Sequence, residues 1–405
     1  MRAIICALLL STLLSACGGG SGGSTPTPPS TAPVATAPTN VVPIVVDNGP
    51  AGNAVNVPYV TVTVCQPGSS TQCQTIDHIL LDTGSTGLRV LASVLSPALN
   101  LSVSAASNGF PLLNCLQFLD TSFTWGPVVG ADVALGASRA SNVPIQVIAD
   151  PKFNALASNC ATGPANNSAS VLGANGVLGV GLFKQDCGPG CASVANNGVY
   201  YACTSAACTR VIGTTVPVAR QVQNPISLLT QDNNGLVVDL AAVPGSGAAT
   251  VSGTMYLGIA TQSNNQVGSA SVLTTDVNGY ITTSFAGTSL ITSFIDTGSN
   301  GLYFDSATVA QCSNPNAGYY CPTNPMMLTA MNRGANGVQT TVSFSIGNAA
   351  QLFSAANNAA LPTLSGPVND AQTFDWGLPF FFGRRVYIGM EGQTSAVGVG
   401  PYFAF

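Results

Sequence analysis

Residues 79–85 read Ile-Leu-Leu-Asp-Thr-Gly-Ser, and residues 294–299 repeat the phrase as Phe-Ile-Asp-Thr-Gly-Ser. In both copies an apolar run ends on an aspartate, and a Gly-Leu pair follows shortly after. The chain has only 15 Asp and Glu among 405 residues, so two aspartates in matched apolar settings indicate a paired role. We expect Asp82 and Asp296 to meet in space as a carboxylate pair.

Few residues in this chain carry a charge. Asp, Glu, Lys and Arg make up 6% of the sequence, against about 25% in an average soluble domain. The net charge is −5, and the ten Lys and Arg residues form no basic cluster. A protein that binds nucleic acid needs a basic surface to neutralise phosphates. The composition therefore excludes nucleic acid as an expected partner.

The N-terminus predicts export and a lipid anchor. After a basic start, residues 3–14 are mostly apolar, a stretch too short to span a membrane but typical of a signal peptide. The Leu-Ser-Ala-Cys that follows resembles a bacterial lipobox, so we expect residues 1–16 to be removed and Cys17 to be lipidated. Gly18, rather than Asp, favours sorting to the outer membrane of the bacterial envelope. The alternative is an ordinary signal peptide with an incidental cysteine.

Composition then separates a tether from two lobes. Residues 17–44 are rich in Gly and then in Thr, Pro and Ala, which predicts a lipidated cysteine followed by a flexible tether. Folding is expected to begin near Val41, in the last residues assigned to the tether. We expect an N-terminal lobe over residues 45–220 and a C-terminal lobe over residues 221–405.

Alternating and glycine-closed apolar runs predict a mainly β protein. Residues 59–64 alternate with a period of two, and after a turn the returning strand runs into Asp82. In the second half, residues 280–285 and 289–295 make a similar hairpin that leads to Asp296. Further strands are expected at residues 175–181, 236–240, 253–259, 341–346 and 386–388.

Ten cysteines remain once Cys6 and Cys17 are set aside, and an even number in an exported chain indicates disulfides. The alternative is a metal site, which is disfavoured because His78 is the single histidine and no Cys-x-x-Cys occurs. We therefore expect no bound metal, and no Ser-His or Cys-His catalytic pair. Close neighbours should pair, and the two cysteines left over should pair with each other: Cys65–Cys73, Cys187–Cys191, Cys203–Cys208, Cys312–Cys321 and Cys115–Cys160.

A repeated Asp-Thr-Gly suits acid–base catalysis. Two carboxylates a few ångströms apart cannot both ionise cheaply, so they share a proton. The ionised member can then activate a water molecule, while the protonated member donates to a developing oxyanion. Glycines would permit the close approach, threonine hydroxyls would fasten the two turns together, and serine hydroxyls would bind the outer carboxylate oxygens. These supporting residues are Thr83, Gly84, Ser85, Thr297, Gly298 and Ser299.

From about residue 45 to its end, the chain resembles a pepsin-type aspartic peptidase, in the variant form of the bacterial exported family called domain of unknown function 3443. Besides the two turns, the resemblance is carried by an element of two apolar residues and a glycine. Val177-Leu178-Gly179 matches it in the first lobe, and Asp375-Trp376-Gly377 is preferred over Phe381-Phe382-Gly383 in the second. The resemblance implies a bilobal fold of two similar β-barrel-like lobes with an active-site cleft between them.

The resemblance also implies a flap over the site. Trp125-Gly126 stands where pepsins have Tyr-Gly, so Trp125 is expected at the flap tip; the alternative is a packing residue of a plain hairpin around Gly126-Pro127. Pepsins have Leu-Trp-Val after the first turn, whereas this chain has Leu88-Arg89-Val90. An aromatic flap residue over Arg89 would form a cation–π contact, and a guanidinium near the pair would favour an ionised carboxylate.

The function implied is that of an aspartic endopeptidase with Asp82 and Asp296 as its catalytic pair. It would act as a monomer on peptide or protein substrates, without a cofactor, and reach the membrane through Cys17. The main alternative is a catalytically inactive lipoprotein that keeps the fold for binding or structure. A third is glycan hydrolysis, for which carboxylates would lie about 5–9 Å apart.

Overall fold

The strand that ends on Asp82 belongs to a closed barrel in the first half of the chain. In the computed structural model, which describes residues 39–405, six strands follow one another in the order β6-β7-β4-β8-β3-β2, and a further pairing between β2 and β6 closes the ring. Along β2, Val62 and Val64 are buried while Thr61 faces solvent, as the alternation predicted. The barrel strands are β2 (Pro58–Cys65), β3 (Cys73–Asp82), β4 (Thr86–Leu91), β6 (Phe123–Leu135), β7 (Ser138–Ile148) and β8 (Gly176–Val180).

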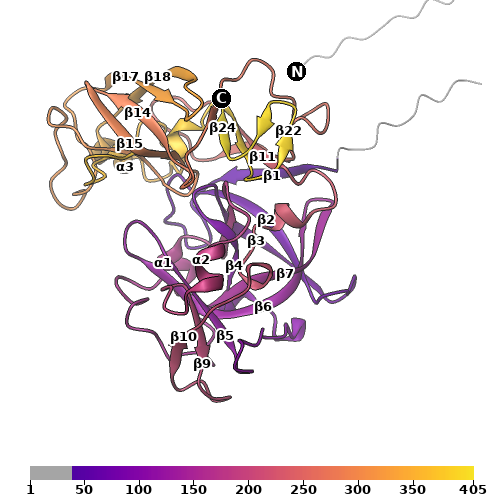
Figure 1. The fold of residues 1–405 in the computed structure, drawn as a ribbon. Helices are drawn as coiled ribbons and strands as arrows, with labels where there is room; N and C mark the ends of the chain where they lie inside the picture. The colour runs from indigo at the N-terminus through magenta and orange to yellow at the C-terminus, as the bar shows by residue number, and fades with distance from the viewer. Residues whose placement is uncertain (1–38) are drawn as a thin grey trace, which may run out of the picture. The chain divides into compact units, whose positions relative to one another are not determined.

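The strand that leads to Asp296 lies in a second sheet, of seven strands, ordered β18-β17-β14-β15-β20-β16-β19. Its core is aromatic: Phe374 stacks on both Phe304 and Trp376, with ring centroids 4.8 and 4.0 Å apart. Figure 1 draws the first barrel in indigo to magenta and these strands in orange to yellow. They are β14 (Ile281–Phe285), β15 (Thr288–Ile295), β16 (Leu302–Phe304), β17 (Met326–Arg333), β18 (Gln339–Ile346), β19 (Ser365–Gly366) and β20 (Phe374–Trp376).

The two lobes repeat one strand pattern around their Asp-Thr-Gly turns. In the first lobe, β3 pairs in parallel with β8, β8 pairs antiparallel with β4, and β4 pairs in parallel with β7. In the second, β15 pairs in parallel with β20, β20 pairs antiparallel with β16, and β16 pairs in parallel with β19. The chain is therefore mainly β and bilobal, as predicted.

A six-stranded layer joins the lobes, in the order β1-β12-β11-β21-β24-β13. Strand β1 pairs with β12 along six residues and with β2 at two. The side chains of its alternate residues, Val42, Ile44 and Val46, are buried. Residues 41–44 thus belong to the fold, and the predicted limit of the tether at residue 44 is wrong. The layer consists of β1 (Val41–Val46), β11 (Gly235–Leu240), β12 (Val251–Leu257), β13 (Val272–Thr274), β21 (Arg385–Gly389) and β24 (Tyr402–Ala404).

Shorter elements complete the described part of the chain, residues 39–405, and all five expected disulfides are present there. None of its helices is long and apolar enough to cross a membrane. The predicted signal peptide, Cys17 and nearly all of the tether lie outside the described residues. The remaining elements are β5 (Leu112–Gln117), β9 (Tyr200–Cys203), β10 (Val211–Gly213), β22 (Thr394–Ser395), β23 (Gly398–Val399), α1 (Ala169–Leu172), α2 (Pro189–Ser193) and α3 (Ala349–Ser354).

Candidate active site

Each Asp-Thr-Gly turn is placed by a parallel pair of strands. Asp82 is the last residue of β3 and lies opposite Gly179 of β8. Asp296 follows β15, and its backbone N–H donates to the carbonyl of Trp376 in β20, at 3.1 Å. This contact shows that Trp376-Gly377 is the glycine-closed element of the second lobe, as preferred over Phe382-Gly383. The matched frames bring the two turns together.

Reciprocal hydrogen bonds between the threonines hold the turns to each other. The N–H of Thr83 donates to Oγ1 of Thr297 at 3.0 Å, and the N–H of Thr297 donates to Oγ1 of Thr83 at 2.9 Å. Each hydroxyl also donates across the interface, Thr297 to the carbonyl of Leu81 at 2.6 Å and Thr83 to that of Ile295 at 3.4 Å. Both threonines are buried, so water does not compete for these bonds.

The two carboxylates are held by donors from their own turns. Oδ1 of Asp82 accepts from the N–H groups of Gly84 and Ser85 at 2.8 and 3.1 Å, and Oδ2 accepts from the Ser85 hydroxyl. Oδ1 of Asp296 accepts from the N–H of Gly298 at 2.6 Å. Its Oδ2 accepts from the hydroxyl of Ser299 at 2.9 Å. Asp82 therefore has three donors and Asp296 has two.

Each carboxylate also lies against the glycine of the opposite turn. A Cβ on Gly84 would fall 2.6 Å from Cγ of Asp296, and a Cβ on Gly298 would fall 2.7 Å from Oδ1 of Asp82. Contacts this short are not tolerated between real atoms, so both positions require glycine. The absence of these two side chains is what allows the carboxylates to approach.

The carboxyl of Asp296 is enclosed beside two other acids. Burial raises the pKa of its carboxyl well above the ordinary value, and the negative charges of Asp82 and then of Asp375 raise it further. The hydrogen bonds from Gly298 and Ser299 act in the opposite direction and are the smaller influence. Asp82, for comparison, has one more hydrogen-bond donor around its oxygens than Asp296 has.

Arg89 does not lie under an aromatic flap residue. It is fully buried and pairs with Asp186, Nη2 to Oδ2, at 3.0 Å. Its other terminal nitrogen, Nη1, donates to the carbonyls of Thr86 and Gly87, at 2.5 and 3.2 Å. Arg89 therefore braces the backbone just after the first turn, with a carboxylate beside it that balances its charge.

Trp125 is a packing residue, and the expectation of a flap tip there is wrong. Its indole N–H donates to the carbonyl of Phe153 at 2.9 Å, and its ring lies 5.2 Å from that of Tyr201. The Gly126-Pro127 pair suggested a turn, but β6 runs through it unbroken. Gly126 is needed because β7 passes so close that a Cβ would lie 1.8 Å from the carbonyl oxygen of Val147.

The turn between β5 and β6, residues 118–122, is the tip of this hairpin. Leu119 at its tip is 79% exposed. The pKa of Tyr303 in β16 is raised first by burial, then by Tyr319 and Asp375, and least by Asp120, the neighbour of Leu119. The tip of the hairpin therefore lies in this turn and not at Trp125.

Sequence reasoning missed a third acid, Asp375. It lies in β20 opposite Phe294 of β15 and Tyr303 of β16. The side chain is 4% exposed, and its Oδ1 has no hydrogen-bond partner. Burial raises its pKa to about 8, and the charge of Asp82 contributes. The available signal was a carboxylate within the apolar run of residues 374–383.

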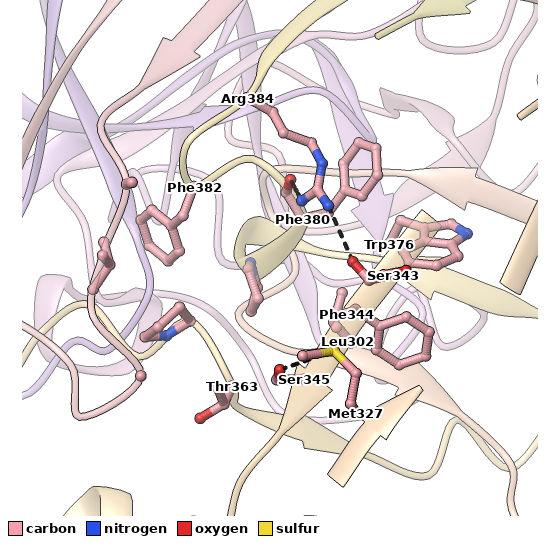
Figure 2. A pocket seen from close by; sticks show the side chains of 15 residues that line it. Leu302, Met327, Ser343, Phe344, Ser345, Thr363, Trp376, Phe380, Phe382 and Arg384 are labelled. Carbon is pink, nitrogen blue, oxygen red and sulfur yellow. Dashed lines mark hydrogen bonds between the residues drawn. The ribbon is translucent and has the colours of Figure 1, made fainter. Parts of the chain in front are cut away.

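A separate cavity of about 350 Å³ lies in the second lobe (Figure 2). Leu302 and Trp376, which flank the second turn, form part of its wall. The guanidinium of Arg384 lies over the ring of Phe380, 4.7 Å from its centroid, and donates to the carbonyls of Phe380 and Ser343. Neither Asp82 nor Asp296 lines this cavity, so it lies apart from the carboxylate pair.

Replacing Thr297 by Val, which has the same shape, should destabilise the fold. The change leaves the N–H of Thr83 and the carbonyl of Leu81 buried without these partners, at a cost of about 2–4 kcal/mol. Thr61→Val on the exposed face of β2 is the matched control and should stay within about 0.5 kcal/mol of wild type. Chemical unfolding measures both, and equal effects would show that the threonine bonds contribute little.

Asp375 should make stability depend on pH. In the folded chain its carboxyl stays protonated up to a pKa of about 8, whereas in the unfolded chain it ionises near pH 4. Its contribution to the free energy of unfolding is therefore full below pH 4 and is lost as the pH rises towards 8. In Asp375→Asn the free energy of unfolding should therefore fall less steeply with pH, by about 1.4 kcal/mol per pH unit between about pH 5 and 7. Asp77→Asn, at a 70% exposed side chain, should keep the wild-type slope, and an unchanged slope in Asp375→Asn would contradict the assignment.

Comparison with known proteins assigns the chain to a family whose function is unknown. An aspartic proteinase from Irpex lacteus is a similar solved structure, with 15% sequence identity and a TM-score of 0.48 over 90% of this chain and 96% of that one. No curated protein matches the chain. The family described as Protein of unknown function (DUF3443) matches residues 36–405. The chain belongs to the DUF3443 family.

Proposed function

We propose that this protein is an aspartic-type endopeptidase in which Asp82 and Asp296 activate a water molecule. The observation that carries the proposal is the pair of buried carboxylates, each against the other's glycine. Such a pair provides a general base and a general acid at one place without a metal or cofactor. The reciprocal threonine bonds support it because they hold the pair in fixed geometry before substrate arrives.

The uneven surroundings assign the roles. Asp82, as the carboxylate, takes a proton from the water while the water oxygen bonds to the carbonyl carbon of the peptide. Asp296, as the acid, gives its proton to the carbonyl oxygen, which produces a neutral tetrahedral diol. In the second step the C–N bond breaks, the amine leaves with the proton held by Asp82, and a hydroxyl of the diol returns a proton to Asp296. Both residues end in their starting states.

Glycan hydrolysis is less well supported than peptide hydrolysis. A glycosidase pair stands about 5–9.5 Å apart on either side of a sugar bond and does not share its proton. Here the threonine bonds draw the two turns together, and Asp82 directly raises the pKa of Asp296. That coupling is the property that a shared-proton mechanism needs.

Cleavage of an unfolded protein at about pH 3 to 6 tests the proposal. Wild type should cleave, pepstatin should inhibit, and Asp82→Asn and Asp296→Asn should each reduce the rate about 100-fold or more. Asp77→Asn should cleave like wild type. A folded chain with its disulfides intact that cleaves nothing over this range would overturn the peptidase and favour the binding lipoprotein. Cleavage that survives both active-site changes would point to a contaminant.

We also propose that the chain is held in the bacterial envelope by a lipid on Cys17. The support is the lipobox-like sequence before Cys17 and a fold with five disulfides, which is typical of exported chains. Labelled palmitate should enter the wild-type chain and the Cys6→Ser control but not Cys17→Ser. Incorporation into Cys17→Ser would refute the anchor.

A further inference from the structure

The cavity in the second lobe has a largely apolar wall (Figure 2). Leu302, Trp376 and Phe380 are each at most 1% exposed, and they contribute aliphatic and aromatic surface to this wall. A volume of about 350 Å³ is within the range of sites that bind small organic molecules. The polar side chains of the wall are Ser343, Ser345, Thr363 and Arg384. The cavity can therefore enclose the apolar body of a ligand and orient it through a few polar groups.

Hydrogen bonds within the fold hold the walls in place. Strand β18, which forms one wall, pairs with β17 along eight residues. The loop that follows β11 is closed by Ala248 and Ala360, whose backbones exchange two N–H···O bonds of 2.9 Å. The N–H of Phe380 donates to the carbonyl of Gly377, also at 2.9 Å. The cavity is therefore formed before a ligand arrives, which reduces the ordering that binding requires.

Arg384 is the charged residue of the wall, and no carboxylate balances it. Within residues 39–405, the ion pairs include Arg89, Arg139 and Arg385 but not Arg384. Its guanidinium is partly withdrawn from water, and this burial lowers the pKa of the side chain. A partly desolvated cation is stabilised by an anion beside it. The cavity therefore favours a negatively charged ligand over a neutral one.

The guanidinium also has hydrogen-bond donors to spare. Of its five N–H groups, the bonds to the carbonyls of Phe380 and Ser343 use one on Nη1 and one on Nη2. Nε has no partner among the described residues, yet it is not one of their enclosed polar atoms, so solvent reaches it. The ring of Phe380 lies against the guanidinium and limits its movement. A carboxylate can therefore accept two N–H bonds from Arg384 in the paired geometry that guanidinium groups favour.

We propose that this cavity binds a small monocarboxylate with an apolar body, whose carboxylate pairs with Arg384 and whose body lies against the aromatic wall. One negative charge matches the one cation of the wall. The site is independent of the peptidase function, because neither aspartate of the pair lines the cavity. Two sources share this chemistry: a free aryl or alkyl carboxylic acid, and the C-terminus of a peptide that ends in an apolar residue.

Calorimetric titration of the purified protein with 3-phenylpropanoate tests the site, with the uncharged 3-phenylpropanamide as the matched ligand. At neutral pH the acid should bind at least about tenfold more tightly than the amide, because only the acid forms charge-assisted bonds with the guanidinium. Equal affinities, or no binding of either compound, would overturn the proposal. N-acetylphenylalanine then separates the sources, since a peptide C-terminus predicts tighter binding than 3-phenylpropanoate and a free acid predicts equal or weaker binding.

Two variants of the wall test the role of the charge. Arg384→Met removes the charge and should weaken binding of the acid about tenfold, whereas Arg333→Met, at an exposed position of β17, should bind like wild type. Ser343→Glu adds a carboxylate at an exposed position of β18, beside the guanidinium, and should weaken binding similarly. Thr341→Glu is its matched control, because it adds the same charge at an exposed position two residues away. Undiminished binding in Arg384→Met and Ser343→Glu would contradict the proposal.

Tryptophan fluorescence locates the ligand. The chain has two tryptophans, Trp125 and Trp376, and only Trp376 lines the cavity. Addition of 3-phenylpropanoate should change the emission of wild type and of Trp125→Phe at the same half-saturating concentration that calorimetry gives. Emission that stays constant while the acid binds would place the ligand outside this cavity.

Discussion

The two hydrogen bonds between Thr83 and Thr297 are the constraint on which the rest of the site depends. Each joins a backbone N–H of one turn to a hydroxyl of the other, and both lie out of reach of water. Each turn ends a strand with a parallel neighbour, so moving one turn would disturb the core of its lobe. A pair of carboxylates that repel each other when ionised can persist only in such a frame, and the frame in turn requires glycine at positions 84 and 298.

Within this symmetric frame the supporting side chains differ. Seven residues after each aspartate, the first lobe has Arg89 and the second has Tyr303. Arg89 pairs with the buried Asp186, which also accepts from the hydroxyl of Tyr200 and the amide of Asn114. Tyr303 donates to Asn300 of its own turn instead. The pair is therefore symmetric in backbone and asymmetric in electrostatics, as the proposed mechanism requires of two identical residues with opposite roles.

Much of this architecture could be predicted because its signals are local. Neighbouring residues alone are enough to recognise the Asp-Thr-Gly repeats, the alternating strands and the four closely spaced disulfides. Cys115–Cys160 could then be predicted because these were the two cysteines left over. Trp125 could not be placed, because Gly126-Pro127 is kept in a strand by contact with Val147, which is distant in sequence. Asp375 was overlooked for the same kind of reason. Its role comes from the burial and the neighbouring carboxylates that the folded lobe creates around it.

Arg89 and Asp375 are buried titratable residues beside the two turns, and their surroundings differ. Arg89 attracts Asp82, but it also has Asp186 at 3.0 Å, so much of its field is cancelled before it reaches the pair. Its hydrogen bonds to the carbonyls of Thr86 and Gly87 remain, and these act on geometry. Asp375 has no basic group among those that shift its pKa, and its charge is one of the causes of the raised pKa of Asp296. A buried ion pair therefore braces the first turn, whereas the second turn lies beside a buried carboxyl that has no such partner.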